Sequence, residues 1–272
     1  PVAHSFPTRR SSDLAAPTLL GRFATDDDAT AVHVTGSTAY VAADDAGLQV
    51  IDVSNPAAPV LVATIPPVEL SETTADEIAH PLLGPPVGRV YPYQKYLNVV
   101  VAGTRAIVVG EHYPGGWSYD NSTSDYYLHI YDVSNPAAPA LLISSYETPG
   151  YAHAVQVVGS TAYVAMAPNY HALSPGGLQM LDISDPTAIT LLGSYETPHL
   201  DAREVQVEGN TAYIANGEAG LQVIDVSNLV APQKHGRYPS LRYITSMHVQ
   251  AENVYMTTSH GLGIGDISDA TA

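Results

Sequence analysis

The side chains best suited to catalysis are three histidines and two neighbouring charged residues. His112, His153, His199, Asp201 and Arg203 carry the imidazole, carboxylate and guanidinium groups that general acid–base catalysis uses. If they converge, they could form a hydrolase or lyase site. The sequence contains no Gly-x-Ser-x-Gly elbow, His-Glu-x-x-His, P-loop or Rossmann fingerprint to accompany them. We therefore keep an enzyme as the alternative hypothesis.

A second set of candidates lies on long insertions, at residues 66–96, 110–126 and 167–176. The candidate binding residues on or beside them are Tyr91, Tyr93, His112, Trp117, Tyr126, His153, Tyr170, His171, His199, Asp201 and Arg203. Because strands alternate in direction, all three insertions are expected on one face of the fold. Aromatic side chains on long loops are typical of a recognition surface. The alternative is that these loops only cover each other and the mouth of a channel.

Carboxylates recur in two patterns that could suggest a metal. One Asp ends the third strand of each repeat, at Asp52, Asp132, Asp182, Asp225 and Asp266. We favour a structural role, in which each Asp accepts a backbone hydrogen bond in the following turn. The loops at 26–28 and 44–45 are also acidic, but no Asp-x-Asp-x-Asp-Gly calcium spacing is present, so a solvated loop is favoured. We expect no metal ligands and no cofactor.

A polar ring is expected along the channel of the fold. His33, Gln156, Gln206 and His248 occupy one position in the first strand of four repeats. If the first strands of the repeats line a central channel, this ring could hold water or a metal. Water is the favoured occupant, because three convergent ligands are not evident.

The elements that must position these residues come from a repeat. The segment Gly-Leu-Gln-Val-Ile-Asp-Val-Ser-Asn-Pro at 47–56 recurs at 127–136, 177–186, 220–229 and 261–270. Each copy contains four short strands, as in 32–35, 39–42, 48–53 and 59–65, and its third strand is apolar on both faces. The sequence predicts an all-β fold, a β-propeller of four-stranded antiparallel blades with about five blades. The expected domain spans 15–272, with blades at about 31–65, 97–147, 153–196, 203–239, and 245–272 plus 17–24.

This repeat resembles the LVIVD-repeat family, a bacterial and archaeal group of propeller-like repeat proteins. The resemblance covers nearly all of residues 17–272 and rests on the motif at 47–56 and its copies. Copy two departs from it by lacking the Gly before Leu128, and copy five has Gly263 and Gly265 in its third strand. The family implies no defined catalytic residues, so none is assigned from it.

The two ends of the repeat array suggest how a ring could close. Residues 18–23 (Thr-Leu-Leu-Gly-Arg-Phe) match the fourth-type strand at 190–195. The last copy stops after its third strand, so residues 18–24 are expected to pair beside 262–267 and complete a five-bladed ring. The alternative is a fragment of a larger ring.

Residues 1–14 are predicted to lie outside the fold and to add nothing to its stability. Residues 4–14 (His-Ser-Phe-Pro-Thr-Arg-Arg-Ser-Ser-Asp-Leu) resemble the translation of a short-read sequencing adapter. This points to a fragment from assembled environmental DNA. Any helix is expected around residues 69–79.

Composition narrows the partners and the compartment. The chain has 27 Asp plus Glu against 10 Lys plus Arg, a net charge of −17, so nucleic-acid binding is not expected. No apolar run is long enough for membrane insertion of this segment. With 18 Tyr, only 2 Phe, very few Lys and abundant Thr, Ala, Gly and Pro, we expect an extracellular, periplasmic or cell-surface protein. The leading hypothesis is a non-enzymatic binding or scaffold module whose partner is an unknown protein, peptide or glycan.

Overall fold

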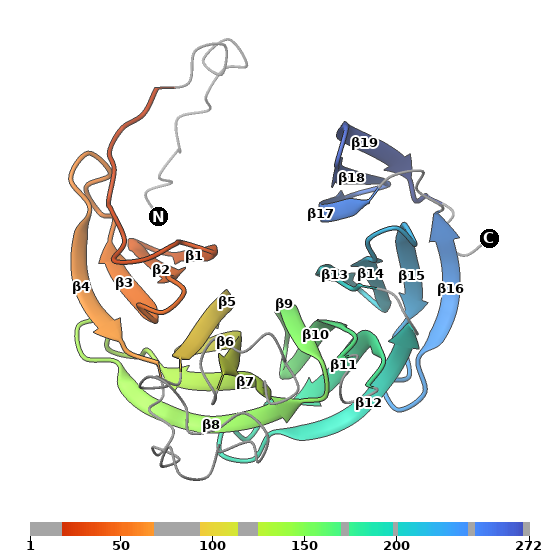
Figure 1. Ribbon diagram of the computed structural model, residues 1–272, viewed down its shortest axis with the longest axis horizontal. Helices are drawn as coiled ribbons and strands as arrows, with labels where there is room; N and C mark the ends of the chain where they lie inside the picture. The colour runs from red at the N-terminus through yellow and green to blue at the C-terminus, as the bar shows by residue number, and fades with distance from the viewer. Residues whose placement is uncertain are drawn as a thin grey trace, which may run out of the picture.

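The computed structural model describes residues 18–67, 93–113, 125–169, 174–197, 201–238 and 243–268 (Figure 1). Their strands form antiparallel sheets that stand side by side around a common axis, as propeller blades do (Figure 1). The predicted all-β propeller of about five blades is confirmed, and the described residues contain no helix. The helix expected around residues 69–79 lies outside the described residues, as do residues 1–14.

None of the described segments is a helix with the length and apolar character needed to cross a lipid bilayer.

The strands divide into five sheets. Blade one consists of β1 (Ala31–Thr35), β2 (Thr38–Ala42), β3 (Leu48–Asp52) and β4 (Val60–Ile65). Blade two consists of β5 (Tyr93–Ala102), β6 (Arg105–Tyr113), β7 (Asp125–Asp132) and β8 (Ala140–Thr148). Blade three consists of β9 (Tyr151–Val158), β10 (Thr161–Ala167), β11 (Gly176–Asp182) and β12 (Thr190–Thr197). Blade four consists of β13 (Glu204–Glu208), β14 (Thr211–Ala215), β15 (Leu221–Asp225) and β16 (Gln233–Tyr238). Blade five consists of β17 (Ile244–Gln250), β18 (Asn253–Thr258) and β19 (Gly261–Asp266).

Two-residue turns join the first and second strands of a blade, as the Gly-Ser and Gly-Asn dipeptides predict. In blade one Thr35 pairs with Thr38, and Gly36 between them has φ of 59°. Glycine adopts this left-handed conformation without steric cost. Blade five instead has Ala251 at φ of 53°, where a Cβ makes the conformation less favourable.

The hydrophobic core lies between successive blades, and we call each such contact a junction. Leu48 and Val50 of β3 point toward blade two and pack with Val99 and Val101 of β5. Ile51 of the same strand belongs to a cluster on the opposite face of blade one. Equivalent clusters form the next three junctions. The third strand is therefore buried on both faces, as its two-sided apolar sequence predicts.

Residues 18–24 do not pair with blade five, which corrects the prediction of ring closure. Among the described residues β17, β18 and β19 form a three-stranded sheet. The segment lies against blade one, where a Cβ on Gly21 would lie only 2.0 Å from the carbonyl oxygen of Pro56. Phe23 packs there against the cluster of Ala39, Val41 and Ile51.

The position of this segment has a counterpart elsewhere in the fold. A Cβ on Gly193 of β12 would lie 2.1 Å from the carbonyl oxygen of Leu229, in the turn of the next blade. Gly21 meets the equivalent turn of blade one in the same way. The sequence match between 18–23 and 190–195 therefore identified the right kind of segment. It did not identify the blade beside which the segment lies, because a strand type is local whereas ring closure depends on the rotation between blades.

Candidate functional site

One face of the propeller contains the strand ends that flank the long insertions and most of the described candidate residues. It is formed where the first and third strands of each blade begin and the second and fourth strands end, and we call it the loop-rich face. His112 lies near the end of β6, His153 near the start of β9, and Arg203 directly before β13. Tyr126 lies near the start of β7.

A polar cluster joins blades three, four and five on this face. Arg203 approaches Asp201 with both Nε and Nη2, each 2.7 Å from Oδ2. The Tyr243 hydroxyl donates to the same carboxylate oxygen, and it lies 2.7 Å from Arg203 Nε. His153 Nε2 lies 3.4 Å from Asp201 Oδ1, and the Arg203 guanidinium carbon lies 5.5 Å from the centre of the Tyr243 ring. We call these four residues the Asp201 cluster.

The Asp201 cluster holds its carboxylate in the ionised form. Burial by itself raises the pKa of Asp201, but the interactions with His153, Tyr243 and Arg203 outweigh it and keep the pKa well below the ordinary value. Burial lowers the pKa of Arg203, and the Asp201 carboxylate more than offsets this and raises it. A general acid or base works best when its pKa lies near the working pH. The cluster therefore favours fixed geometry over proton transfer.

Three of the five residues of the predicted enzyme site come together, and one does not. His153, Asp201 and Arg203 are members of the Asp201 cluster, whereas His112 is buried in blade two. His112 Nδ1 lies 3.9 Å from Asp125 Oδ2. Burial lowers the pKa of His112 more than Asp125 raises it, so the imidazole is kept neutral. His199 lies outside the described residues.

Of the aromatic candidates, only Tyr126 and Tyr93 lie within the described residues. Tyr126 is buried and its ring centre lies 4.2 Å from that of Tyr151, so it supports the face from within and does not offer a contact surface. Tyr93 is the first residue of β5. The candidates Tyr91, Trp117, Tyr170 and His171 lie outside the described residues.

Sequence reasoning missed Tyr243, which completes the Asp201 cluster. Tyr243 directly precedes the first strand of blade five, as Arg203 directly precedes the first strand of blade four. This shared position was the available signal. It was hidden because a β-bulge between Ile244 and Ser246 shifts the register of β17 against β18.

Two of the four residues of the predicted polar ring, Gln156 and Gln206, link neighbouring blades, and we call each such link a clip. Gln156 of blade three binds the backbone of Val207 in blade four, with Oε1 2.5 Å from the Val207 nitrogen and Nε2 3.4 Å from its oxygen. Gln206 binds Val249 of blade five in the same manner, at 2.6 Å and 2.9 Å. Both amides are used by the neighbouring strand, so they are not ligands facing the channel. This corrects the prediction for the two glutamines, whereas for His33 and His248 it stays a prediction.

The aspartates that end the third strands have the structural role favoured from sequence. In each of the five blades, an Oδ1 atom accepts a hydrogen bond of 2.8 Å from the backbone nitrogen two residues later. The bonds from Ser54 lower the pKa of Asp52, and the other four repeat this. These residues stabilise turns on the face opposite to the loop-rich face.

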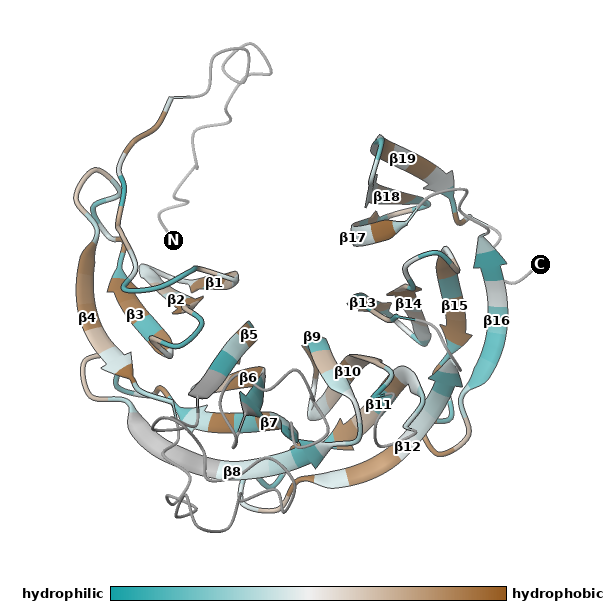
Figure 2. Cartoon of the chain, in the orientation of Figure 1, coloured by the Kyte–Doolittle hydropathy of each residue, from teal (hydrophilic) through white to brown (hydrophobic). Residues whose placement is uncertain are grey.

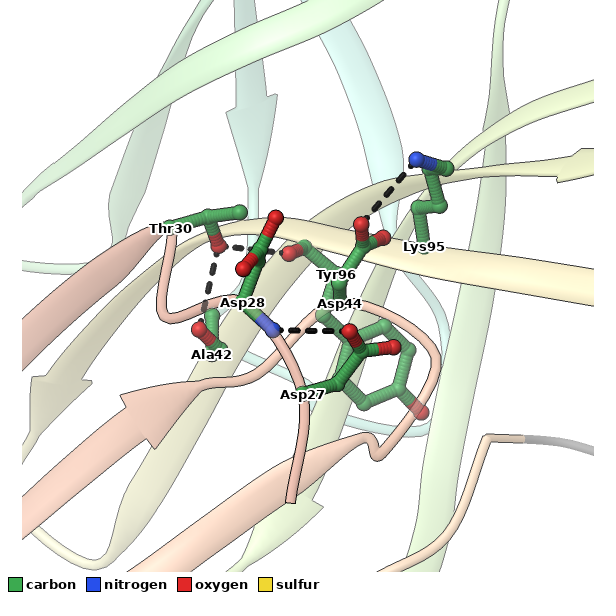
Figure 3. A network of polar contacts seen from close by, with 7 residues as sticks. All are labelled: Asp27, Asp28, Thr30, Ala42, Asp44, Lys95 and Tyr96. Carbon is green, nitrogen blue, oxygen red and sulfur yellow. Dashed lines mark hydrogen bonds and ion pairs between the residues drawn. The ribbon is translucent and has the colours of Figure 1, made fainter. Parts of the chain in front are cut away.

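The two acidic loops of blade one meet on the loop-rich face (Figure 3). Oxygen atoms of Asp27, Asp44 and Asp45 all lie within 4.8 Å of one another. Burial, Asp44 and Asp27 raise the pKa of Asp45, which Lys95 partly offsets. Lys95 Nζ lies 3.0 Å from Asp44 Oδ2 and neutralises part of the charge. Sequence reasoning treated these loops as solvated and left their convergence unaddressed.

A small hollow of about 160 Å³ lies on the same face at blade three. Its lining includes Met166, Pro175, Leu178 and Tyr195, with Gln179 as a polar member. The Gln179 side-chain oxygen is buried and has no hydrogen-bond partner among the described residues. The hollow therefore has mainly apolar walls, with Gln179 among its polar lining residues.

Comparison with known proteins identifies the repeat. The family model of the LVIVD repeat matches residues 26–65, 123–148, 149–197 and 201–239, which together make up more than half of the chain. No curated protein matches the chain.

Among solved structures similar to the chain, the alignment with Sqt1 supports the fold alone. The structure of Sqt1 from Saccharomyces cerevisiae aligns with a TM-score of 0.57 at 10% identity, covering 90% of this chain and 60% of that chain. The computationally designed Ika8 protein aligns at 9% identity with a TM-score of 0.43, covering 89% of this chain and 85% of that chain. The designed Ika4 protein aligns at 9% identity with a TM-score of 0.41, covering 93% of this chain and 99% of that chain.

Proposed function

Because the chain belongs to the LVIVD repeat family, we propose that it is a binding or scaffold module without catalytic activity. Propellers provide a rigid support, and function is carried by the loops and side chains that the support presents. We infer that recognition occurs on the loop-rich face and that the partner is a protein or peptide. The hydrolase or lyase alternative is not favoured, because His112 is buried in blade two and does not join His153, Asp201 and Arg203.

The observation that carries this proposal is the Asp201 cluster. Side chains from three successive blades hold one another in place, so little conformational entropy is lost when a partner binds. Arg203 keeps 41% of its side chain exposed although it is paired with Asp201. A guanidinium group has five N–H donors, and those that remain can bind a carbonyl or carboxylate oxygen of a partner.

The hollow at blade three supports a peptide over a small molecule. Sites for small molecules enclose roughly 300–1,000 Å³. A volume of about 160 Å³ suits one side chain of a docked partner.

The test is a screen of the purified chain against a displayed random-peptide library and, in parallel, a glycan array. Arg203→Ala should weaken the affinity of selected peptides by about tenfold or more, equivalent to about 1.4 kcal/mol. Lys234→Ala is the matched control, because it removes one exposed cation from the start of β16 on the opposite face. Thermal melts of both variants show that the fold is intact.

Two results would contradict the proposal. Peptide binding that survives Arg203→Ala but is lost in Lys234→Ala would mean that recognition occurs on the face opposite to the loop-rich face. Glycan binding without peptide binding, or no binding to either probe, would exclude the proposed class of partner.

We further propose that the module acts at the cell surface, in the periplasm or outside the cell. The tyrosine-rich, lysine-poor composition supports this. Protease added to intact cells that express the native gene should degrade the protein and spare a cytoplasmic control. Full protection in intact cells, with degradation after lysis, would exclude the cell surface and the medium and leave only the periplasm to test.

A further inference from the structure

Blade five exposes apolar side chains that every other blade buries. Leu262 and Ile264 of β19 are 67% and 58% exposed. The leucines at the same motif position in the other blades are 0% exposed: Leu48, Leu128, Leu178 and Leu221. The residues equivalent to Ile264 are 0–5% exposed: Val50, Ile130, Met180 and Val223. Figure 2 shows this hydrophobic strand at one end of the arc of blades. We call the surface of Leu262 and Ile264 the tail face.

Blade one exposes the other half of the same kind of contact. Val32 and Val34 of β1 are 63% and 55% exposed. The residues equivalent to Val32 are 3–8% exposed, because each packs against the preceding blade: Val99, Val155, Val205 and Met247. We call the surface of Val32 and Val34 the head face.

The four observed junctions show what covers such faces. In each junction the third strand of one blade packs on the first strand of the next, as Leu221 and Val223 pack with Met247 and Val249. The tail face offers the first of these surfaces and the head face offers the second. We propose that the tail face of one copy of this chain docks on the head face of a second copy, forming a fifth junction between molecules.

The segment before blade one supports this pairing. Residues 18–23 lie where the outer strand of a preceding blade would run, and Leu19 and Leu20 are exposed. β19 is an edge strand of its sheet among the described residues. Docking would bring residues 18–23 of one copy beside β19 of the other as its fourth strand. One contact would thus cover both apolar faces and pair an open sheet edge.

A second copy fits better than closure of one chain on itself. Blades one and five lie at opposite ends of the arc and are well separated (Figure 1). The junctions between them are close-packed and two of them are clipped by Gln156 and Gln206, which resists the change in angle that closure would need. A head-to-tail contact of this kind is heterologous and can continue into a ring or a filament.

One residue would tune this contact. His248 holds the position in blade five that Gln156 and Gln206 hold in blades three and four. Those glutamines bind the backbone at Val207 and Val249, so His248 of one copy would face the backbone of Val34 in the other. A glutamine there would supply both a donor and an acceptor. His248→Gln should therefore tighten self-association by about tenfold, equivalent to about 1.4 kcal/mol.

The test is sedimentation velocity on two blocked variants and their mixture. The first carries Val32→Lys and Val34→Lys, which charge the head face, and the second carries Leu262→Lys and Ile264→Lys, which charge the tail face. The wild-type chain should show a mass that rises with concentration between about 1 µM and about 1 mM, where micromolar interfaces become populated. Each blocked variant alone should remain a monomer, and the mixture should form a dimer with one copy of each.

The other outcomes each overturn the proposal. A wild-type chain that stays monomeric throughout would mean that it closes on itself or leaves both faces open. A blocked variant that still dimerises alone would show that like faces pair. The exposed positions make misfolding of the variants easy to detect, since their melting curves should match the wild-type curve.

Discussion

The junction between blades one and two and the junction between blades four and five use the same backbone contact with different side chains. The Asp44 carbonyl accepts a hydrogen bond from the Tyr96 nitrogen at 3.4 Å, and the Gly217 carbonyl accepts one from the Ile244 nitrogen at 3.1 Å. In both cases the loop between the second and third strands reaches the first strand of the next blade. Because this contact needs no side chain, the repeats can diverge without losing their stacking.

The side chains at these two junctions serve different purposes. At junction four–five, Gln206 clips the next blade, and the Asp201 cluster balances its own charges. At junction one–two, His33 stands at the clip position, and the hydroxyls of Tyr96 and Tyr131 meet at 2.5 Å inside the core. The acidic residues around Asp44 have only Lys95 as a described cationic partner. The two junctions therefore share their apolar core and their backbone contact, and they differ in the polar side chains around them.

The largest expected effect comes from the apolar core that the two junctions share. Leu48→Ala and Leu221→Ala each remove a fully buried side chain, and each should lower the free energy of unfolding by about 2–5 kcal/mol. Chemical denaturation measures both. Leu262→Ala is the matched control at the same motif position, and its exposed side chain should cost less than about 0.5 kcal/mol in the monomer. Unequal losses at Leu48 and Leu221 would show that the two junction cores are not equivalent.

The next largest effect comes from the clip, the pair of hydrogen bonds between the Gln206 side chain and the Val249 backbone. Gln206→Ala removes two hydrogen bonds to the Val249 backbone and should lower the free energy of unfolding by about 1–3 kcal/mol. His33→Ala, at the same position in blade one, should change it by less than about 0.5 kcal/mol. Urea denaturation of the two variants gives the comparison. A loss at His33 as large as that at Gln206 would mean that both junctions are clipped.

A third pair of variants changes Gly217 and Asp44, the two loop residues whose carbonyls make the shared backbone contact. Gly217 has φ of 50°, and a Cβ there would lie 3.0 Å from the Tyr243 ring, so Gly217→Ala should cost about 1–2 kcal/mol. Asp44 has φ of 42°, so Asp44→Gly relieves backbone strain while it removes the ion pair with Lys95. These two effects oppose each other, and the net change should stay below about 1 kcal/mol. Thermal denaturation should separate the two variants, and equal losses would contradict the comparison.

The smallest expected effects come from Asp201 and Asp45, whose contributions to the free energy of unfolding change with pH in opposite directions. Asp201 has a lowered pKa, so its contribution to stability is present above the unfolded value of about 3.9 and is lost as the pH falls toward the folded pKa. Asp201→Asn should therefore lower the free energy of unfolding by about 1 kcal/mol at pH 7 and by less at pH 3. The measurement is denaturation at both pH values.

Asp45 should behave in the reverse sense, because its pKa is raised. Its charge opposes folding at neutral pH, and this opposition disappears as the pH falls through the folded pKa. Asp45→Asn should raise the free energy of unfolding at pH 7 by no more than about 0.5 kcal/mol, since the side chain is exposed and screened. No gain at pH 7, or a gain that persists at pH 3, would show that the carboxylates of the acidic loops do not repel one another.

Local features of the fold were predictable from the sequence. Strand position followed from apolar alternation, and the turn at Gly36 followed from its dipeptide, because both depend on neighbouring residues. The aspartates that cap the third strands were recognised as structural from their recurrence in every copy. The repeat was sufficient to predict blades, since a two-sided apolar strand must be covered on both faces.

The contacts between blades were decided only by the tertiary structure. Gln156 and Val207 are 51 residues apart, and the sequence does not indicate that one clips the other. Asp201 and Tyr243 are 42 residues apart and meet only because blades four and five are rotated by a particular amount. The place of residues 18–24 was likewise decided by their packing against blade one. A repeat motif specifies the unit and the faces it must bury, whereas the angle between units comes from side-chain packing at each junction, which no single copy encodes.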